Sequence, residues 1–328
     1  MVDRFNKEKS LQLKGVAIIF MLWLHLYGHD NLIQKDNYYT ELWGGVTKFL
    51  LVLFHICVPV FLFIAGYGAA IKHKPSKPLV MKICSLYKKI WIVAIVFFPL
   101  AFSLGKLELH VGELLLNLSG FYYSYCGEWW FIGLYVLLEI YIYILEKIGI
   151  SNNIKTLVVL SGCLMVAGYA LKVINPSVTK INTVQWIPYT FLIKQPIFMS
   201  GYICNKKGVF NKTNVKKYGI FGIVTWGFLF VDIPESFYMP FVVPCFVAAF
   251  CCIPLCKVIN KFLLLLGKNS TYMWLTHSWL IYKFLQPVIY GLHDVVANLI
   301  VLLVLDFVVA YGFKRAEMCI DKYCYKTK

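Results

Sequence analysis

The chain has 328 residues, of which 60% are hydrophobic and only 15% are charged, a far more apolar balance than that of soluble globular proteins. A net charge of +16 would suggest nucleic-acid binding in a soluble protein, but here the Lys and Arg residues stand in short runs between long apolar segments, which is the pattern that sets orientation in a membrane. The composition therefore argues against a soluble domain and a nucleic-acid partner. It predicts an all-α polytopic membrane protein whose main partner is the lipid bilayer.

A helix needs about 20 mostly apolar residues to cross the ~30 Å hydrocarbon layer of a bilayer. The chain offers about ten such segments, and we predict about ten transmembrane helices. They cover residues 11–27, 46–71, 90–104, 129–145, 156–174, 186–202, 218–230, 237–256, 271–286 and 295–313. No loop between them is long enough for a separate soluble domain, so we interpret residues 1–328 as one membrane domain.

The distribution of basic residues predicts that both termini are cytoplasmic. With that orientation the Lys and Arg residues gather on the cytoplasmic side, apart from Lys35, Lys48, Lys106, Lys172, Lys180, Lys194 and Lys283. The first apolar segment has no small-residue cleavage site and is predicted to remain as an anchor. The 11 cysteines show no ligand-like CxxC spacing, so we expect neither disulfides nor a metal site.

The first predicted helix carries two polar residues on one face. Lys14 and His25 are eleven residues apart, and eleven steps of ~100° return to within ~20° of the same face after a rise of ~16 Å. Strongly polar side chains are costly in a membrane and mark functional sites. Lys14 would hold a phosphate at the inner surface while His25 acts deeper on a carbonyl or hydroxyl group. The alternative is that Lys14 only follows the positive-inside rule and His25 only bonds a neighbouring helix.

The second predicted helix places His55 at a depth similar to that of His25. His55 would be either a partner of His25 or a filler of a polar seam between helices. Pro59 removes a backbone donor and predicts a kink. Gly66 and Gly68 predict close approach of a neighbouring backbone.

The fourth predicted helix begins with a carboxylate and two indoles, in Glu128, Trp129 and Trp130. The tryptophans suit an interfacial belt. Glu128 would orient a histidine or accept a sugar hydroxyl, or it would simply be a solvated interfacial acid. Glu139 lies deeper, and a structural pair with another helix is the simplest explanation for it.

The ninth predicted helix contains a third buried histidine. His277 lies about two turns inside it, between Thr276 and Ser278. These neighbours favour a polar contact between helices, and the alternative is a role in substrate binding.

Four segments together resemble the integral membrane acyltransferase family 3, which includes bacterial surface-polysaccharide O-acetyltransferases. The first is the basic residue, ten residues and histidine of the first helix, matched by Lys14 and His25. The second is a Phe-rich stretch ending in Ser-Gly-Tyr, represented at 61–67. The third is the Trp-containing start of a later helix, at 129–132, and the fourth is a segment near the C-terminus that ends in His, at 270–277. The resemblance spans nearly the whole chain.

The chain departs from the family pattern at two positions. Lys14 stands where Arg is common, which keeps the charge but loses the forked contact of a guanidinium to phosphate or carboxylate. Ala65 stands where Ser usually precedes Gly-Tyr, which suggests packing rather than chemistry at that position.

The resemblance implies transfer of an acyl group, usually acetyl from cytoplasmic acetyl-CoA, to a hydroxyl of a cell-envelope glycan. It implies a multi-pass protein of a bacterial plasma membrane, with an acyl-CoA donor and an envelope glycan as its partners. Lys14 would bind the donor, and His25 would be the general base, assisted by Glu128 or His55. The remaining candidates, for substrate binding, are Tyr67, Trp129, Trp130 and His277.

Two other functions fit the sequence. Buried histidines and proline kinks also suit a transporter or flippase for a glycan or small solute, although no inverted repeat is evident. A haem protein with His25 and His55 as axial ligands is a third hypothesis. Both direct transfer and an acyl-enzyme route are compatible with the acyltransferase hypothesis.

Overall fold

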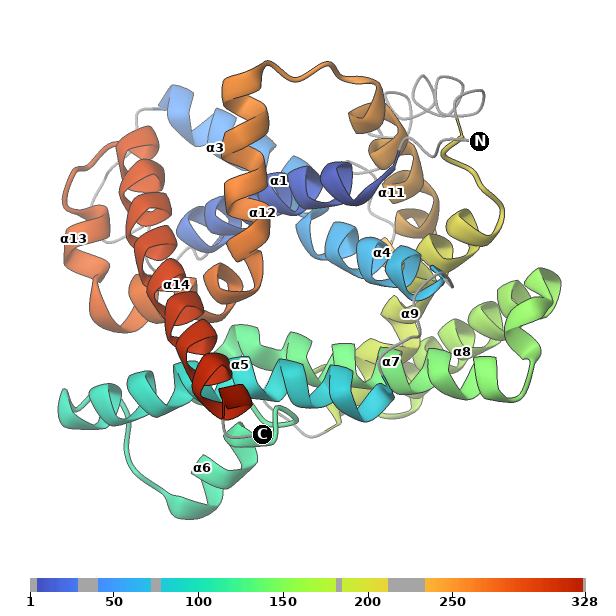
Figure 1. Cartoon of the computed structure of the whole chain (residues 1–328), viewed down its shortest axis with the longest axis horizontal. Coiled ribbons are helices and arrows are strands. Elements are labelled where there is room, and N and C mark those ends of the chain that lie inside the picture. Colours follow the sequence, from blue (N-terminus) through green and yellow to red (C-terminus); the bar gives the residue numbers. More distant parts are fainter. Residues whose placement is uncertain (1–4, 29–40, 72–77, 181–184, 212–233, 327–328) are drawn as a thin grey trace.

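The computed structural model describes residues 5–28, 41–71, 78–180, 185–211 and 234–326. Within these ranges the chain forms helices and connecting loops and no strand, as Figure 1 shows. The predicted all-α class is therefore confirmed.

The described helices follow one another in chain order. Their bounds are α1 (Lys7–Tyr27), α3 (Glu41–Phe54), α4 (Cys57–Ala69), α5 (Leu79–Ser103), α6 (Val111–Leu118), the 3₁₀ turn η1 (Gly127–Trp129), α7 (Trp130–Lys147), α8 (Ile154–Ile174), α9 (Trp186–Lys206), α11 (Glu235–Cys252), α12 (Lys257–Ser278), α13 (Gln286–Tyr290) and α14 (Val295–Lys326). A π-helical segment, η5 (Trp279–Phe284), joins α12 to α13.

Seven helices of the described chain are long and apolar enough to cross a membrane. They confirm a polytopic membrane protein, while the count of ten spans and the orientation of the termini stay predictions. The predicted spans 186–202 and 271–286 correspond to α9 and to the end of α12 with η5 and α13, which are helical but not among the seven. The predicted span 218–230 lies outside the described residues.

Two closely packed helix pairs form the centre of the structure. The helix α1 packs along α12, and α4 packs along α9. A side chain at Gly267 would collide with the backbone oxygen of Leu11, and one at Gly66 would collide with that of Phe198. Small residues thus let these backbones touch, as is common between membrane helices. The prediction of close approach is confirmed at Gly66 and wrong at Gly68, where a side chain would meet nothing.

The predicted kink of the second span is also present. The helix is interrupted at residues 55–56, between α3 and α4, and Pro59 follows within the first turn of α4. A proline provides no N–H to the carbonyl four residues earlier, and its ring crowds that carbonyl. For Pro59 that carbonyl belongs to His55, so the interruption falls where the proline requires it.

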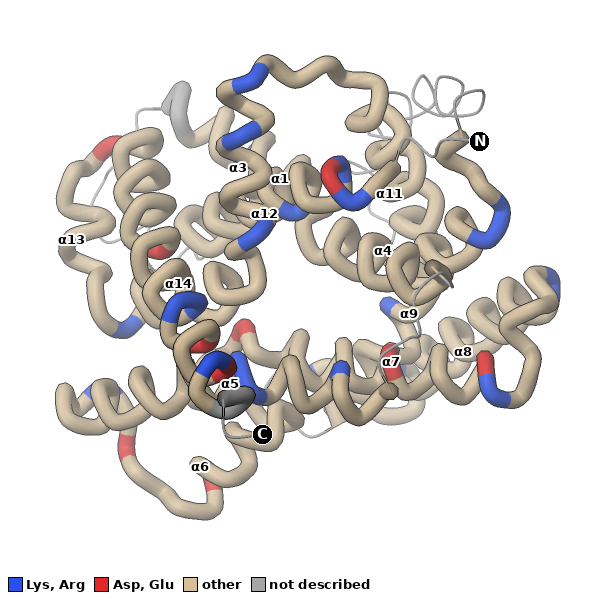
Figure 2. Tube along the Cα trace, in the orientation of Figure 1, with Lys and Arg blue, Asp and Glu red and all other residues tan. Residues whose placement is uncertain are grey.

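Charged residues cluster where α14 crosses α5 (Figure 2). Lys88 contacts Asp321 at 2.8 Å, and Lys89 contacts Glu317 at 2.7 Å. Glu317 also accepts a hydrogen bond from the Tyr272 hydroxyl at 3.0 Å. This network joins α5, α12 and α14, and its member Lys89 also lines the cavity described below.

Replacing Gly267 with alanine is expected to destabilise the protein strongly, because the new methyl group would overlap the backbone of α1. We expect a loss of about 3 kcal/mol in the free energy of unfolding, as for other overpacked cores. Gly162→Ala in α8, where a side chain meets open space, is the matched control. Thermal unfolding of both variants in the same detergent checks the prediction, and equal melting temperatures would contradict it.

Candidate functional site

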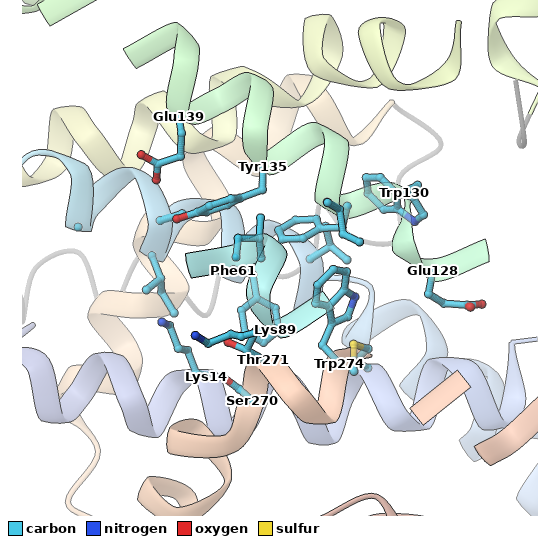
Figure 3. A pocket seen from close by; sticks show the side chains of 18 of the residues that line it. Lys14, Phe61, Lys89, Glu128, Trp130, Tyr135, Glu139, Ser270, Thr271 and Trp274 are labelled. Atoms are coloured by element: carbon cyan, nitrogen blue, oxygen red, sulfur yellow. The ribbon is translucent and has the colours of Figure 1, made fainter. Parts of the chain in front are cut away.

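A cavity of about 510 Å³ lies between α1, α4, α5, α7 and α12. Its polar lining residues are Lys14, His25, Lys82, Ser85, Lys89, Glu128, Tyr135, Glu139, Ser270 and Thr271. In Figure 3, Lys14 and Lys89 lie toward one end of the cavity and Glu128 lies at the other, with Trp130 and Trp274 close to Glu128. The cavity therefore has a basic end with Lys14 and Lys89, on whose side Glu139 also lies, and an opposite end that carries Glu128 (Figure 3).

Lys14 and His25 both line this cavity, which confirms that they share one face of α1. The helix runs unbroken from Lys7 to Tyr27, so the two residues are about 16 Å apart along its axis. Asn6 caps the helix start, since its side chain accepts a hydrogen bond from the Lys9 N–H at 2.9 Å. The basic residue and the imidazole are thus fixed by one rigid element.

Lys14 is joined at the basic end by two lysines of α5. Lys82 and Lys89 line the cavity with Ser85 and Leu86, and this spacing places all four on one face of the helix. Lys82 contacts Glu139 of α7 at 3.1 Å, which confirms the predicted pairing of Glu139 with another helix. Within the described ranges no carboxylate lies within ion-pair distance of Lys14. Its charge is therefore available to an anionic ligand.

His25 contacts two groups through the same ring nitrogen. Its Nδ1 lies 3.7 Å from Glu128 Oε1 and 3.1 Å from the Tyr282 hydroxyl. That hydroxyl donates its only proton to the backbone oxygen of His25 at 3.0 Å, so it can only accept from Nδ1. The geometry therefore places the ring proton on Nδ1 and the lone pair of a neutral imidazole on Nε2.

Tyr282 belongs to the π-helical segment η5. Such segments are rare and are often found at functional sites. Tyr282 holds both the backbone and the ring of His25 from a position 257 residues further along the chain. It is a positioning residue that sequence reasoning missed, because no local pattern connects the two positions.

His277 lies against His25, with their ring centroids 4.7 Å apart. It is fully buried, and its Nδ1 donates to the Trp274 backbone oxygen at 2.8 Å. Its Nε2 has no hydrogen-bond partner within the described part of the chain. His277 supports the position of the His25 ring and does not line the cavity. The structure thus favours the interhelical contact over a substrate-binding position.

Three other predicted site residues, Trp129, Trp130 and Tyr67, differ in their position relative to the cavity. Trp130 lines the cavity, but Trp129 is buried, donates to the Leu275 backbone oxygen at 3.2 Å and packs on Trp279. Tyr67 packs in an aromatic cluster with Phe5 and does not line the cavity. Of these three candidates, only Trp130 is placed to touch a ligand in this cavity.

His55 lies apart from this site. Its Nδ1 is 2.8 Å from Glu235, and its side chain is 62% exposed. Lys194 contacts the same carboxylate at 3.1 Å. The structure brings His277 rather than His55 to His25, so the position of His55 supports neither a role as base partner nor paired haem ligation with His25.

A second cavity of about 160 Å³ adjoins the first. Glu128 lines both cavities, and Tyr282 lines the second. Glu128 therefore lies where the two cavities meet, and both residues contact His25, which lines the first cavity only. Within the described residues, no group of three or more His, Cys, Asp or Glu side chains is arranged to hold a metal ion.

Sequence comparison identifies one family. A family model described as an acyltransferase domain matches residues 11–315, which is nearly the whole chain. No curated protein and no solved structure matches the chain. The matched region contains every residue that lines the two cavities.

Proposed function

Because the chain belongs to acyltransferase family 3 and is therefore a membrane acyltransferase, we propose that it transfers acetyl from cytoplasmic acetyl-CoA to a hydroxyl group of a cell-envelope glycan. The observation that carries the proposal is the cavity that joins Lys14 to His25. A cation at one end suits the phosphates of the donor, and a base at the other end suits the reacting hydroxyl. Family membership does not favour the transporter hypothesis.

The basic end of the cavity binds the donor in this proposal. The phosphates of acetyl-CoA contact Lys14, whereas Lys82 and Lys89, which line the cavity beside it, are each paired with a carboxylate, Glu139 and Glu317 respectively. The pantetheine arm extends along the apolar lining, which includes Phe61, Ile64 and Trp274. The thioester then lies close to His25. Holding both substrates in this way lowers the entropic part of the barrier.

Direct transfer follows from the position of the imidazole. His25 Nε2 removes the proton from the acceptor hydroxyl, and the oxygen attacks the thioester carbonyl. The tetrahedral intermediate collapses to the ester and CoA thiolate, which takes the proton from the imidazolium. Glu128, 3.7 Å from the ring, stabilises the imidazolium, and Tyr282 keeps the ring in place. General-base assistance of this kind typically contributes about 10²–10⁴-fold.

The proposed location is a bacterial plasma membrane, with both termini cytoplasmic and the chain forming one domain. The basic end of the cavity then faces the cytoplasm, where acetyl-CoA is present. The end with His25 and Glu128 faces outward, toward the envelope glycan. Labelling of Lys9→Cys in intact cells with a membrane-impermeant thiol reagent tests this orientation, because a cytoplasmic Lys9 position stays unlabelled.

Replacing Lys14 with glutamine is expected to raise KM for acetyl-CoA about tenfold while kcat changes little, because the lost interaction is made equally in the ground and transition states. Acetylpantetheine carries the same thioester without the nucleotide phosphates, and its KM should not change. Lys14→Arg should retain low KM, since a guanidinium also binds phosphate.

Lys172→Gln is the matched control, because Lys172 is an exposed residue of α8 outside both cavities. Steady-state rates with the two donors measure the effect. An equal rise in KM for acetyl-CoA and acetylpantetheine would show that Lys14 does not recognise the phosphates.

A further inference from the structure

The second cavity differs in character from the first. Glu128 is the one residue that lines both within the described chain. The second cavity lies against the loop before η1 and against η5, and its polar lining consists of Ser124, Tyr125, Cys126, Glu128, Ser278, Tyr282 and Lys283. Neither Lys14 nor the lysines of α5 line it. It therefore approaches the reacting groups from a side other than the basic end.

The position of this cavity suits the acceptor. Glu128 and Tyr282, which line it, both contact the His25 ring. His25 lines only the first cavity, so an acceptor seated in the second cavity would extend its hydroxyl past Glu128 into the first cavity to reach Nε2, from the side away from the basic end. Two substrates that approach one base from different cavities can be held in reacting geometry at the same time.

The lining of the second cavity indicates the chemistry of its ligand. Hydroxyl groups are supplied by Ser124, Tyr125, Ser278 and Tyr282, and they suit a polyhydroxylated ligand. Ser124 is itself held in place by the Asn117 amide at 3.0 Å, and the Ser278 hydroxyl lies 3.3 Å from the Cys126 thiol.

Lys283 is the single cation in this lining. Among the described residues no carboxylate lies within ion-pair distance of it. The carboxylate of Glu128 is directed to His25 at 3.7 Å. An oxyanion on the ligand would therefore complement Lys283 while a hydroxyl of the same ligand lies toward Glu128 and His25.

We propose that the second cavity binds the acceptor and that Lys283 selects an acceptor with an oxyanion, either a carboxylate or a phosphate, near the hydroxyl that is acylated. This inference rests on the proposed function, and it adds the chemical class of the acceptor. Acidic sugars and polyol phosphates belong to this class, whereas neutral glycans do not.

Thiol protection tests the proposal without turnover. The substitution Ser124→Cys places a reporter thiol in the lining, and because the native Cys126 lines the same cavity, fragment ions in mass spectrometry are used to assign alkylation to position 124. Glucuronate and glycerol 3-phosphate are the anionic probes, and glucose and glycerol are the neutral counterparts. At equal concentration, at least one anionic probe should slow alkylation more than its neutral counterpart does.

Adding Lys283→Gln to the reporter variant should weaken the protection by that anionic probe about fivefold, the effect of one charge near a protein surface. Lys106→Gln, at an exposed residue outside both cavities, should leave the protection unchanged. Protection by only one anion would identify the oxyanion as carboxylate or phosphate. No selective protection, or protection that survives Lys283→Gln, would overturn the proposal.

The result of this experiment does not depend on whether the proposed function is correct. Protection requires binding alone, whereas the proposed function requires consumption of acetyl-CoA. A protein that shows Lys283-dependent protection but never releases CoA would contradict acetyl transfer and leave the anion site in place. A protein that releases CoA but shows no selective protection would retain acetyl transfer and lose the inference about the acceptor.

Discussion

Replacing His25 with alanine is expected to lower kcat for acetyl transfer by about 10²–10⁴-fold, the range that general-base assistance provides. His25 lines the first cavity and contacts Glu128 and Tyr282, which line the second. The basic end, about 16 Å away along α1, is left intact, so KM for acetyl-CoA should change little. Release of free CoA at saturating donor measures kcat directly.

His110→Ala is the matched control for this variant, because His110 is an exposed histidine that contacts Glu108 at 3.3 Å and lines neither cavity. It should retain wild-type rates. His55→Ala tests the alternative partner that the sequence suggested. Full activity of a correctly folded His25→Ala variant would refute the proposed mechanism.

Glu128→Gln is expected to lower kcat by about 10²-fold, which is the lower end of the range for proton transfer. The amide keeps the shape of the side chain but removes the charge that stabilises the imidazolium 3.7 Å away. Tyr282 still holds the ring through Nδ1, so the tautomer of His25 is preserved. The effect should therefore be smaller than that of His25→Ala.

The double variant that combines His25→Ala with Glu128→Gln tests whether Glu128 acts through His25. If Glu128 acts through His25, Glu128→Gln should reduce kcat far less in the His25→Ala background than in the wild type. Glu108→Gln, at a carboxylate whose side chain is 89% exposed, is the control. Independent, multiplicative losses in the double variant would show that Glu128 acts elsewhere.

The part of the site that lies on one helix was predictable from the sequence. Lys14 and His25 share a face because a helix fixes both rotation and rise over eleven residues. The close approach at Gly66 and the interruption before Pro59 follow from the same local rules. These features depend on residues near one another in the chain, where periodicity carries information.

The partners of the site residues were not predictable in this way. His25 meets Tyr282 and His277, whereas His55, at a similar predicted depth, meets Glu235. These contacts depend on which helices pack against each other, and the hydropathy of the sequence does not show which helices do so. Lys82 and Lys89 of α5 are seven residues apart, a spacing that places them on one face of a helix. From the sequence alone, however, they are indistinguishable from an ordinary run of basic residues at the inner membrane surface.

Composition alone is also a weak guide to the number of membrane-spanning helices. The helix α9 is 21 residues long, yet Lys194, Gln195 and Pro196 lie within it. Within a membrane, a polar side chain that packs against protein costs less free energy than one that faces lipid. In α9, Gln195 is fully buried and bonds Ser161 of α8 at 2.8 Å. Average hydropathy does not separate these two situations.

The proposed reaction moves acetyl from acetyl-CoA to a glycan hydroxyl, with His25 as the general base. The most direct measurement follows isotopic label from acetyl-CoA into an envelope-glycan extract, together with free CoA, for reconstituted wild type and for His25→Ala with folding checked in parallel. We expect wild type to transfer label to the glycan in step with CoA release and His25→Ala to do both at least about 10²-fold more slowly. Equal labelling by the two proteins, or no consumption of donor by folded wild type with a competent acceptor, would contradict it.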